Sequence, residues 1–209
     1  MANERLIHLV DDDEAIRRAA SFMLRTSGFL VKTYASGVEF LSAAADIGPG
    51  CILLDVRMPE MDGLEVQKAL RDRGILLPVV VITGHGDIGL AVDAMKAGAV
   101  DFIEKPFAKE VLIGAIKEGF SRIEQASRRH ARADEAQARL EKLTPRERDV
   151  LEGLVRGHPN KTIAYDLGIS PRTVEIHRAN LMTKLEVPSL SEALRLAFAA
   201  GLGDKPDPA

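Results

Sequence analysis

The stretch LLDVRMPEMDG, residues 53–63, ends an apolar run on a carboxylate, Asp55, and passes at once into a loop that contains Pro59 and Gly63. Continuous apolar runs of this length are typical of strands that are buried on both faces of a parallel sheet. Four other short apolar runs in the first half of the chain fit the same pattern. We therefore expect strands at residues 6–10, 29–34, 51–55, 78–83 and 99–104.

The segments between these runs are predicted to be helices, because apolar residues recur in them at spacings of three and four. The recurring residues are Ile16, Ala19, Ala20 and Met23, then Val38 and Leu41, then Val66, Ala69 and Leu70, then Val92 and Met95, and finally Leu112, Ala115 and Ile116. Parallel neighbours need right-handed crossovers, so strict alternation of strand and helix places helices on both faces of the sheet. The predicted fold is a doubly wound α/β domain with a five-stranded parallel sheet.

The pattern changes after this domain. Residues 121–142 are almost entirely helix formers with few large apolar side chains, which indicates a helical linker, and from residue 143 onward no strand pattern remains. An ordinary exposed helix within one larger domain is the alternative for the linker. We expect an α/β domain over residues 1–120, a linker over 121–142, and a small all-α domain over 143–209.

The last segment contains a pair of helices. NKTIAYDLG, residues 160–168, predicts a short helix that ends at a Gly turn, and residues 169–185 predict a second helix opened by Ser170 and Pro171. This is the spacing of a helix-turn-helix, although small helical bundles also contain short helices and Gly turns.

Composition limits the remaining classes of protein. Apolar residues make up 46% of the 209-residue chain, yet no uncharged apolar window of about 18 residues indicates a membrane span. The N-terminus does not have the pattern of a signal peptide, and the single Cys51 has no partner for an internal disulfide. We expect a cytoplasmic protein with no membrane partner.

Charge is distributed unevenly along the chain. Residues 1–120 hold 13 basic and 18 acidic side chains, whereas residues 121–209 hold 15 basic and 13 acidic ones. Within residues 156–184 five basic side chains face two acidic ones, a balance that suits a polyanion such as nucleic acid. On charge alone, an ordinary solvated surface is an equally good interpretation.

Polar side chains follow four of the predicted strands. They are Asp11 and Asp12, Asp55, Thr83, and Lys105. Ligands of open parallel sheets bind outside the carboxyl ends of the strands, so these side chains are expected to meet at one edge. Taken singly, each has another interpretation as a cap, a turn residue, a strand former or a surface charge.

As a set, the five side chains fit carboxylate phosphorylation. The carboxylates of Asp11, Asp12 and Asp55 are ligands that suit Mg²⁺ or Mn²⁺. Asp55 is predicted to be the nucleophile that attacks phosphorus in line, while Lys105 and Thr83 stabilise the phosphoryl oxygens.

Five stretches of the chain resemble the motifs of one family. They are VDDDEAIR (10–17), LLDVRMPEMDG (53–63), VVVITGHGD (79–87), VDFIEKPF (100–107) and LTPRERDVLEGLVRGHPNKTIAYDLGISPRTVEIHRANLMTKLEV (143–187). The chain resembles two-component response regulators of the NarL/FixJ group, in which a flavodoxin- or CheY-like receiver precedes a LuxR-type helix-turn-helix. The resemblance covers nearly the whole chain.

The resemblance implies that Asp55 accepts a phosphoryl group from the histidine of a sensor histidine kinase. It also implies a magnesium site formed by Asp11, Asp12, Asp55 and the backbone carbonyl of Arg57. In the implied switch, Thr83 moves toward the phosphoryl group and an aromatic side chain turns inward. Many receivers carry Tyr at that aromatic position, whereas this chain has Phe102, so the switch is expected to rely on packing. A plain core role for Phe102 is the alternative.

The second helix of the pair is expected to lie in the major groove of double-stranded DNA. Its groove-facing residues are predicted to be Arg172, Glu175, Ile176, Ala179 and Thr183. Candidates for phosphate or flanking contacts are Lys161, Thr173, His177, Arg178 and Lys184. His177 has an equally good interpretation as a helix-packing histidine. Arg172 is the natural reader of guanine, and much of the affinity is expected to be salt-dependent.

A single helix-turn-helix reads few base pairs, so a homodimer formed on phosphorylation is expected on a near-palindromic site. The family dimer face implies Val92, Lys96 and Asp101 here. We expect a transcriptional activator, with RNA polymerase as a further partner, and no enzyme activity apart from self-catalysed transfer to and hydrolysis from Asp55. Two rivals are an aspartyl-phosphate phosphohydrolase, which would need an acid where Arg57 stands, and a DNA-binding protein with an unphosphorylated dimerisation module.

Overall fold

The computed structural model describes residues 5–44, 47–84 and 88–203. Two compact units are present, Met1–Gln125 and Ala126–Ala209, and each is described by itself. The predicted boundaries at residues 120 and 142 stay predictions. Residues 85–87, the end of the VVVITGHGD stretch, lie outside the described residues.

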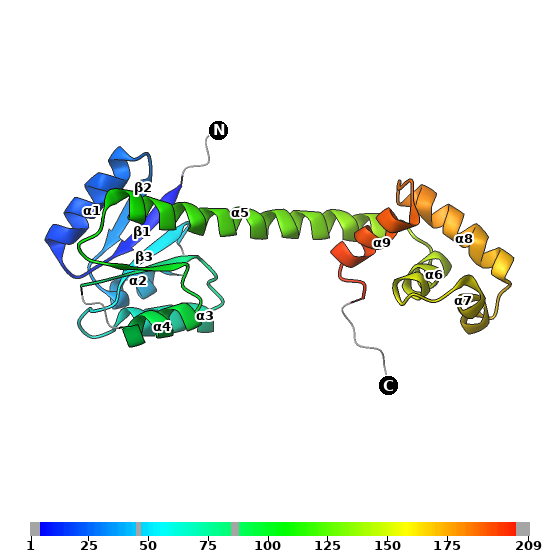
Figure 1. Ribbon diagram of the computed structural model, residues 1–209, viewed down its shortest axis with the longest axis horizontal. Coiled ribbons are helices and arrows are strands. Elements are labelled where there is room, and N and C mark those ends of the chain that lie inside the picture. The colour runs from blue at the N-terminus through cyan, green and yellow to red at the C-terminus, as the bar shows by residue number, and fades with distance from the viewer. Residues whose placement is uncertain (1–4, 45–46, 85–87, 204–209) are drawn as a thin grey trace. The chain divides into compact units, whose positions relative to one another are not determined.

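The first unit contains a five-stranded parallel sheet. Its strands are β1 (Leu6–Val10), β2 (Leu30–Tyr34), β3 (Cys51–Asp55), β4 (Val79–Thr83) and β5 (Asp101–Glu104). All four strand pairs are parallel and the order is β2-β1-β3-β4-β5, which confirms the predicted doubly wound fold (Figure 1). The strand order reverses at β1, so its carboxyl end and that of β3 flank the position where such sheets bind ligands.

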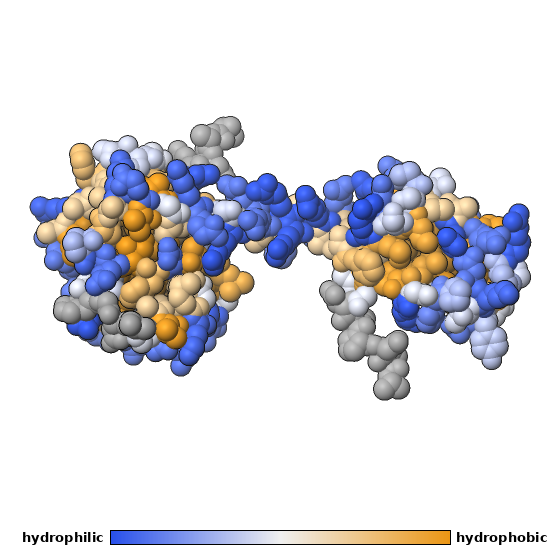
Figure 2. Space-filling model, viewed as in Figure 1, coloured by the Kyte–Doolittle hydropathy of each residue, from blue (hydrophilic) through white to orange (hydrophobic). Residues whose placement is uncertain are grey.

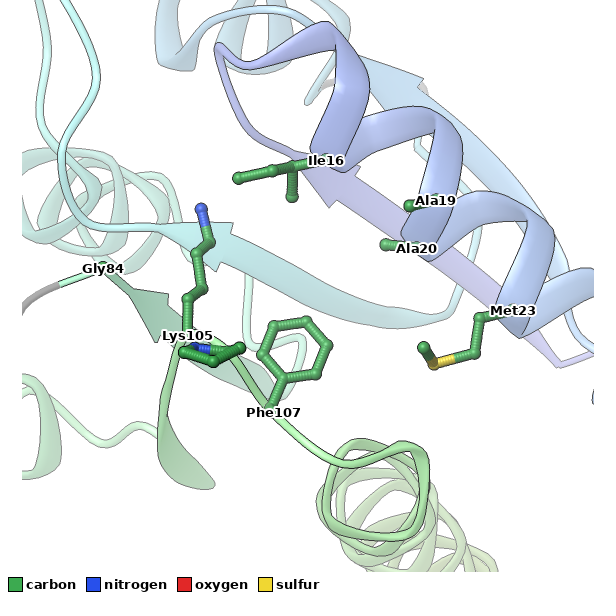
Figure 3. A pocket seen from close by; sticks show the side chains of 8 residues that line it. Ile16, Ala19, Ala20, Met23, Gly84, Lys105 and Phe107 are labelled. Carbon is green, nitrogen blue, oxygen red and sulfur yellow. The ribbon is translucent and has the colours of Figure 1, made fainter.

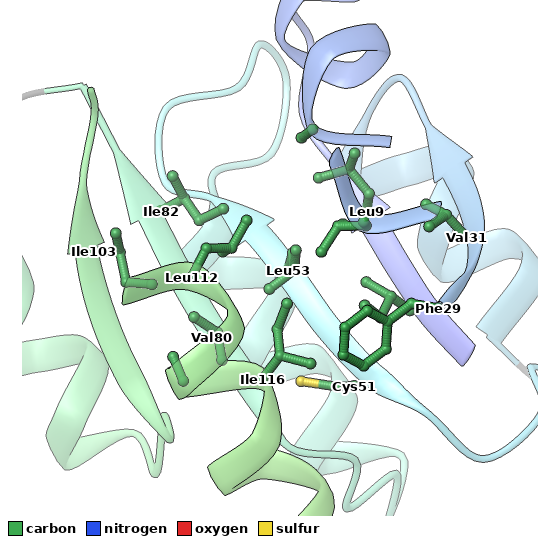
Figure 4. Close-up of a cluster of buried hydrophobic side chains, with 14 of the residues drawn as sticks. Leu9, Phe29, Val31, Cys51, Leu53, Val80, Ile82, Ile103, Leu112 and Ile116 are labelled. Atoms are coloured by element: carbon green, nitrogen blue, oxygen red, sulfur yellow. The ribbon is translucent and has the colours of Figure 1, made fainter. Parts of the chain in front are cut away.

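Five helices accompany the sheet. They are α1 (Glu14–Thr26), α2 (Gly37–Ala43), α3 (Gly63–Asp72), α4 (Ile88–Lys96) and α5 (Lys109–Leu140). Helices α1 and α5 cover one face of the sheet, and α2, α3 and α4 cover the other (Figure 1). On the first face, Leu112 and Ile116 of α5 pack against Leu53 and Val80 of the central strands (Figure 4).

Two predicted helix faces lie differently from the expectation. Val92 and Met95 recur at the spacing of one helix face, but their exposed fractions are 43% and 46%, so this face does not pack into the core. Val38 is also exposed, at 42%. Among the α4 side chains that the structure describes, Ala94 alone is fully buried, and Leu90, one turn earlier, packs partly buried against the same core.

The second unit is all-helical. It contains α6 (Pro145–Val155), α7 (Asn160–Leu167), α8 (Pro171–Lys184) and α9 (Leu190–Ala199), together with the last turns of α5. Its core includes Leu140 of α5 beside Leu151, Val174 and Leu181. Gly168, at φ +65°, ends α7, and Ser170 caps α8, as the sequence predicted.

The middle of α5 carries little apolar surface. From Glu124 to Glu135 every side chain except that of Ala133 is exposed. Figure 2 shows the same stretch covered almost entirely by hydrophilic residues. Across the described residues, no helix is both long and apolar enough to span a membrane.

Candidate functional site

The strand ends bring together the side chains that the sequence placed after them. Asp11 directly follows β1, Asp55 ends β3, Thr83 ends β4, and Lys105 directly follows β5. Because these four strands are parallel and adjacent, their carboxyl ends form one edge. Asp11, Asp55 and Thr83 are buried, with exposed fractions of 1%, 6% and 0%.

Three carboxylates form a compact acidic cluster at this edge. One oxygen each of Asp11, Asp12 and Asp55 lies within 4.8 Å of the others, and Asp12 is exposed to solvent. Oxygen Oδ1 of Asp55 is buried and faces the Lys105 ammonium at 3.2 Å. This set of donors suits a small hard cation such as Mg²⁺. Such a cation binds carboxylate oxygens and keeps water molecules at its other coordination positions.

Lys105 compensates part of the negative charge. Its Nζ donates to Asp11 Oδ2 at 2.6 Å and lies 3.2 Å from Asp55 Oδ1. The backbone N–H of Lys105 donates to the carbonyl oxygen of Thr83 at 2.7 Å, which fixes the start of the lysine side chain beside β4. The predicted lysine therefore contacts two of the three acids.

The electrostatics of the cluster follow from burial and crowding. Burial raises the pKa of Asp55 to about 6, the charges of Asp11 and Asp12 add to the rise, and Lys105 opposes it. For Lys105 itself, burial disfavours the ammonium, but the hydrogen bond to Asp11 and the charge of Asp55 outweigh it, so its pKa is raised. The ammonium therefore persists at neutral pH.

The loop after β3 explains the glycine of the opening motif. A Cβ on Gly63 would lie 2.3 Å from the carbonyl oxygen of Asp55, so only glycine lets the chain turn back beneath this residue. The Gly63 N–H donates to the Val56 carbonyl at 2.9 Å. Asp62 and Glu65 then form a capping box that starts α3. Asp55 is thus held by a strand on one side and a capped helix on the other.

Two further predicted residues lie at the same edge. Phe102 of β5 is half-buried and packs against the side of the core that contains α4. The Arg57 side chain is exposed in the loop two residues after Asp55. The roles proposed for the Phe102 ring and the Arg57 carbonyl stay predictions.

An apolar hollow of about 480 Å³ adjoins Lys105 on the α1 side of the sheet. Figure 3 shows the Lys105 side chain and the Phe107 ring facing it from one side and the α1 helix from the other. The α1 residues that line it are Ile16, Ala19, Ala20 and Met23.

In the second unit, α7 and α8 have the expected helix-turn-helix spacing, and the predicted groove face of α8 is exposed. Arg172 and Glu175 are solvent-accessible, and their side chains pair with each other at 3.1 Å. Ile176 is 50% exposed. Ala179, Thr183 and Lys161 are exposed as well.

The other predicted contact residues are half-buried and take part in helix packing. Arg178 donates to Asn160 Oδ1 at 2.9 Å and so connects α8 to α7. Lys184 donates to the buried Glu147 at 2.7 Å. The Thr173 N–H donates to Ser170 Oγ at 3.1 Å. His177 is half-buried, and its Nδ1 has no hydrogen-bond partner among the described residues.

Comparison with known proteins matches a domain family to each end of the chain. Residues 7–117 match the response regulator receiver domain, and residues 141–197 match the bacterial regulatory proteins of the luxR family. The chain is a response regulator of the NarL/FixJ group. It is similar to the transcriptional regulatory protein FixJ of Rhizobium meliloti, with 50% identity over 94% of this chain and 97% of that protein.

Solved response regulators show the same architecture. Full-length FixJ from B. japonicum is 45% identical, with a TM-score of 0.61, over 95% of this chain and 98% of that one. The response regulator StyR is 39% identical, with a TM-score of 0.73, over 93% and 98%. The protein is therefore a phosphorylation-controlled transcriptional regulator with a DNA-binding domain of the LuxR type.

The receiver domain exposes the residues of the predicted dimer face. Val92 and Lys96 lie on α4 and Asp101 begins β5, and all three are exposed. The Asp101 carboxylate accepts a hydrogen bond from the Phe102 N–H at 2.8 Å. Met95 adds a further apolar side chain to the exposed surface of α4.

Two residues of this response regulator were missed in the sequence. Asn180 is exposed on α8 between the predicted groove residues Ala179 and Thr183, and an amide side chain is a natural reader of adenine. Periodicity alone could have found it, because it lies four residues after Ile176. Glu147 forms an ion pair with Lys184, and because the two residues are 37 positions apart the sequence carries no local signal for this pair.

Proposed function

We propose that Asp55 is the phosphoryl acceptor of this response regulator. A carboxylate oxygen of Asp55 attacks phosphorus, an O–P bond forms, and the N–P bond to the histidine of the donor kinase breaks. The observation that carries this role is the buried Asp55 carboxylate at the strand-end edge, which lies beside Asp11 and Asp12 and has its Oδ1 3.2 Å from Lys105 Nζ. Water later hydrolyses the acyl phosphate.

Each neighbour of Asp55 has a separate task. Lys105 pairs with an oxygen of the transferred group, and the Thr83 hydroxyl donates to another. Asp11, Asp12, Asp55 and the Arg57 carbonyl would hold Mg²⁺ or Mn²⁺, consistent with the acidic cluster. When bound, this cation supplies positive charge that neutralises the incoming phosphoryl group.

The donor is proposed to be a sensor histidine kinase that contacts the α1 side of the receiver. Support comes from the apolar hollow beside Lys105, because a protein donor must place its phosphohistidine next to Asp55. A helix of the donor that laid apolar residues on Ala19 and Met23 would bring its histidine to that edge.

The output is proposed to be activation of transcription in the cytoplasm. A homodimer formed through Val92, Lys96 and Asp101 would place two α8 helices on two half-sites, and the bound dimer would contact RNA polymerase. Movement of Thr83 toward the phosphoryl group, followed by inward packing of Phe102, would connect Asp55 to that face. The exposed Val92 and Met95 support this surface, since they leave apolar area uncovered.

Replacement of Asp55 by Asn tests the central role. The amide keeps the shape of the side chain but lacks the nucleophilic oxygen, so the folded variant is expected to gain no phosphoryl mass with acetyl phosphate and Mg²⁺. Intact-mass measurement, with circular dichroism as the control for folding, decides the matter. Full phosphorylation of the Asp55→Asn variant would show that another residue is the nucleophile.

A further inference from the structure

A buried glutamine connects α3 to the C-terminal end of α4. Gln67 is 3% exposed and lies within an otherwise apolar side of the core. Its Nε2 donates to the carbonyl oxygen of Ala97 at 3.0 Å and to that of Ala94 at 3.4 Å. Its Oε1 is buried and has no partner within the described ranges.

These contacts satisfy carbonyls where a helix normally leaves them free. The last four carbonyls of a helix have no intrahelical donor. At the end of α4 the chain turns through Gly98, at φ +87°, and the Ala99 N–H donates back to Ala94 at 3.0 Å. The Gln67 amide therefore serves as a C-terminal cap that is supplied by a neighbouring helix.

Little else of large size fixes this end of α4. Ala94 is the fully buried side chain among those described on the helix, while Val92 and Met95 point to solvent. A buried amide that leaves its own oxygen unpaired costs free energy, whereas an apolar side chain of similar size would not. A role in fixing the position of α4 therefore explains a glutamine at position 67, whereas a role in filling the core does not.

We propose that Gln67 is a positioning residue that holds the C-terminal end of α4 on α3, so that phosphorylation turns α4 about this end. The inference rests on the proposed function, because it assumes that α4 carries the dimer face. The turn would move Val92 more than Lys96, since Lys96 lies next to the fixed end. Gln67 contacts neither Asp55 nor the phosphoryl group, and it acts through α4 alone.

Hydrogen exchange on the full-length protein tests the clamp. Gln67→Met and Gln67→Leu keep an apolar filling but remove the donor, and Gln125→Leu, at an exposed position of α5, is the matched control. In both Gln67 variants the amides of Gly98 and Ala99 are expected to exchange about five- to tenfold faster, the size expected for one lost hydrogen bond. Two independent replacements guard against one of them failing to fold. Unchanged exchange in both folded variants would overturn the clamp.

Phosphorylation with acetyl phosphate and Mg²⁺ tests the pivot. In the wild type, phosphorylation is expected to change the exchange rates of residues 90–93 and to leave those of residues 97–99 constant. In Gln67→Met, the exchange rates of both segments are expected to change. The phosphorylated dimer of this variant is expected to dissociate about fivefold more readily. Equal changes at both ends of α4 in the wild type would contradict the pivot, as would an unaltered dimer in Gln67→Met. If intact mass shows no phosphorylation of the wild type, the proposed function is wrong. The clamp is still tested in that case, because hydrogen exchange of the unphosphorylated wild type and Gln67 variants does not depend on phosphorylation.

Discussion

Lys105 Nζ lies closer to Asp11, at 2.6 Å, than to Asp55, at 3.2 Å. A cation that uses the Asp11 carboxylate must therefore compete with an ammonium that remains charged at neutral pH. Lys105→Met is expected to tighten Mg²⁺ binding about tenfold. This change in binding free energy is smaller than the attraction between two neighbouring unit charges. Titration calorimetry measures the affinity, and Lys109→Met, at an exposed position, should leave it unchanged. Equal or weaker binding in Lys105→Met would mean that the lysine does not compete for Asp11.

Gly63→Ala is expected to destabilise the receiver by about 1–3 kcal/mol, because backbone must shift to accommodate the new methyl group. The added Cβ would lie 2.3 Å from the Asp55 carbonyl. Gly114→Ala in α5 is the control: a Cβ there meets open space, and alanine favours a helix by up to about 1 kcal/mol. Urea unfolding of the full chain, followed by circular dichroism, compares the two variants. Similar midpoints would show that the loop beneath Asp55 adapts without strain.

That Asp11, Asp55 and Lys105 meet at one edge could be predicted from the sequence, because strand direction determines it. Once residues 6–10, 51–55, 78–83 and 99–104 are assigned to parallel strands, Asp11, Asp55 and Lys105 must follow strands at one edge. No contact between distant side chains has to be guessed. The carboxylate that Lys105 approaches more closely could not be predicted, since it depends on side-chain rotamers within a few ångströms.

Helix faces were predicted less reliably, because periodicity identifies an apolar stripe and not what covers it. Val92 and Met95 form such a stripe on α4, yet the side facing the core is that of Ala94. The same limit applies to α8. Lys184 was expected near DNA phosphates because it is basic, but its partner Glu147 lies on another helix, and only the fold brings the two together.

Glu147→Gln is expected to destabilise the second unit by about 2 kcal/mol at pH 7, because a charge-assisted hydrogen bond to Lys184 becomes a neutral one. Burial opposes ionisation of Glu147, but hydrogen bonds from Lys184 and Thr144 outweigh it, so its pKa is lowered in the folded protein. A lowered folded pKa contributes stability that is present above the unfolded value of 4.5 and lost as pH falls through the folded value. The difference between wild type and variant should therefore shrink below about pH 4.5.

Urea unfolding at pH 7 and at pH 3.5, followed at the helices of the second unit, measures this difference. Lys184→Met is the partner variant, and it should cost more at pH 7 than Glu147→Gln because it leaves a buried carboxylate unpaired. A Glu147→Gln penalty that is the same at both pH values would show that the ion pair contributes no net stability.

Lys161→Ala and Arg172→Ala should separate positioning on DNA from base reading. Loss of the exposed Lys161 ammonium removes one phosphate contact, so affinity should fall for every sequence alike and the salt slope should decrease by about one. Arg172→Ala should also relax base preference at one position, at a cost of about 1–3 kcal/mol for the preferred base. Binding to a pool of randomised duplexes at several salt concentrations measures both effects. If Lys161→Ala alters sequence preference and keeps the salt slope, the proposed placement of α7 on the duplex is wrong.

The way in which the receiver controls the DNA-binding domain leads to the last prediction. The unphosphorylated receiver is expected to keep DNA binding weak, either by occluding α8 or by withholding the dimer. A complete switch from about 1:99 to 99:1 requires roughly 5.5 kcal/mol of differential stabilisation, more than one phosphoryl group and its cation are expected to provide. Some binding by the unphosphorylated protein should therefore remain.

A fragment of residues 124–209 distinguishes the two routes. It retains Leu140, the α5 side chain that belongs to the core of the second unit, so it is expected to fold without the receiver. Under occlusion the fragment should bind specific DNA more tightly than the unphosphorylated full chain at equal concentration. Under dimer control it should bind no better until its concentration is raised, because two half-sites must be filled independently. If phosphorylation of the full chain alters neither its oligomeric state nor its DNA affinity, neither route operates, and control must act after DNA is bound.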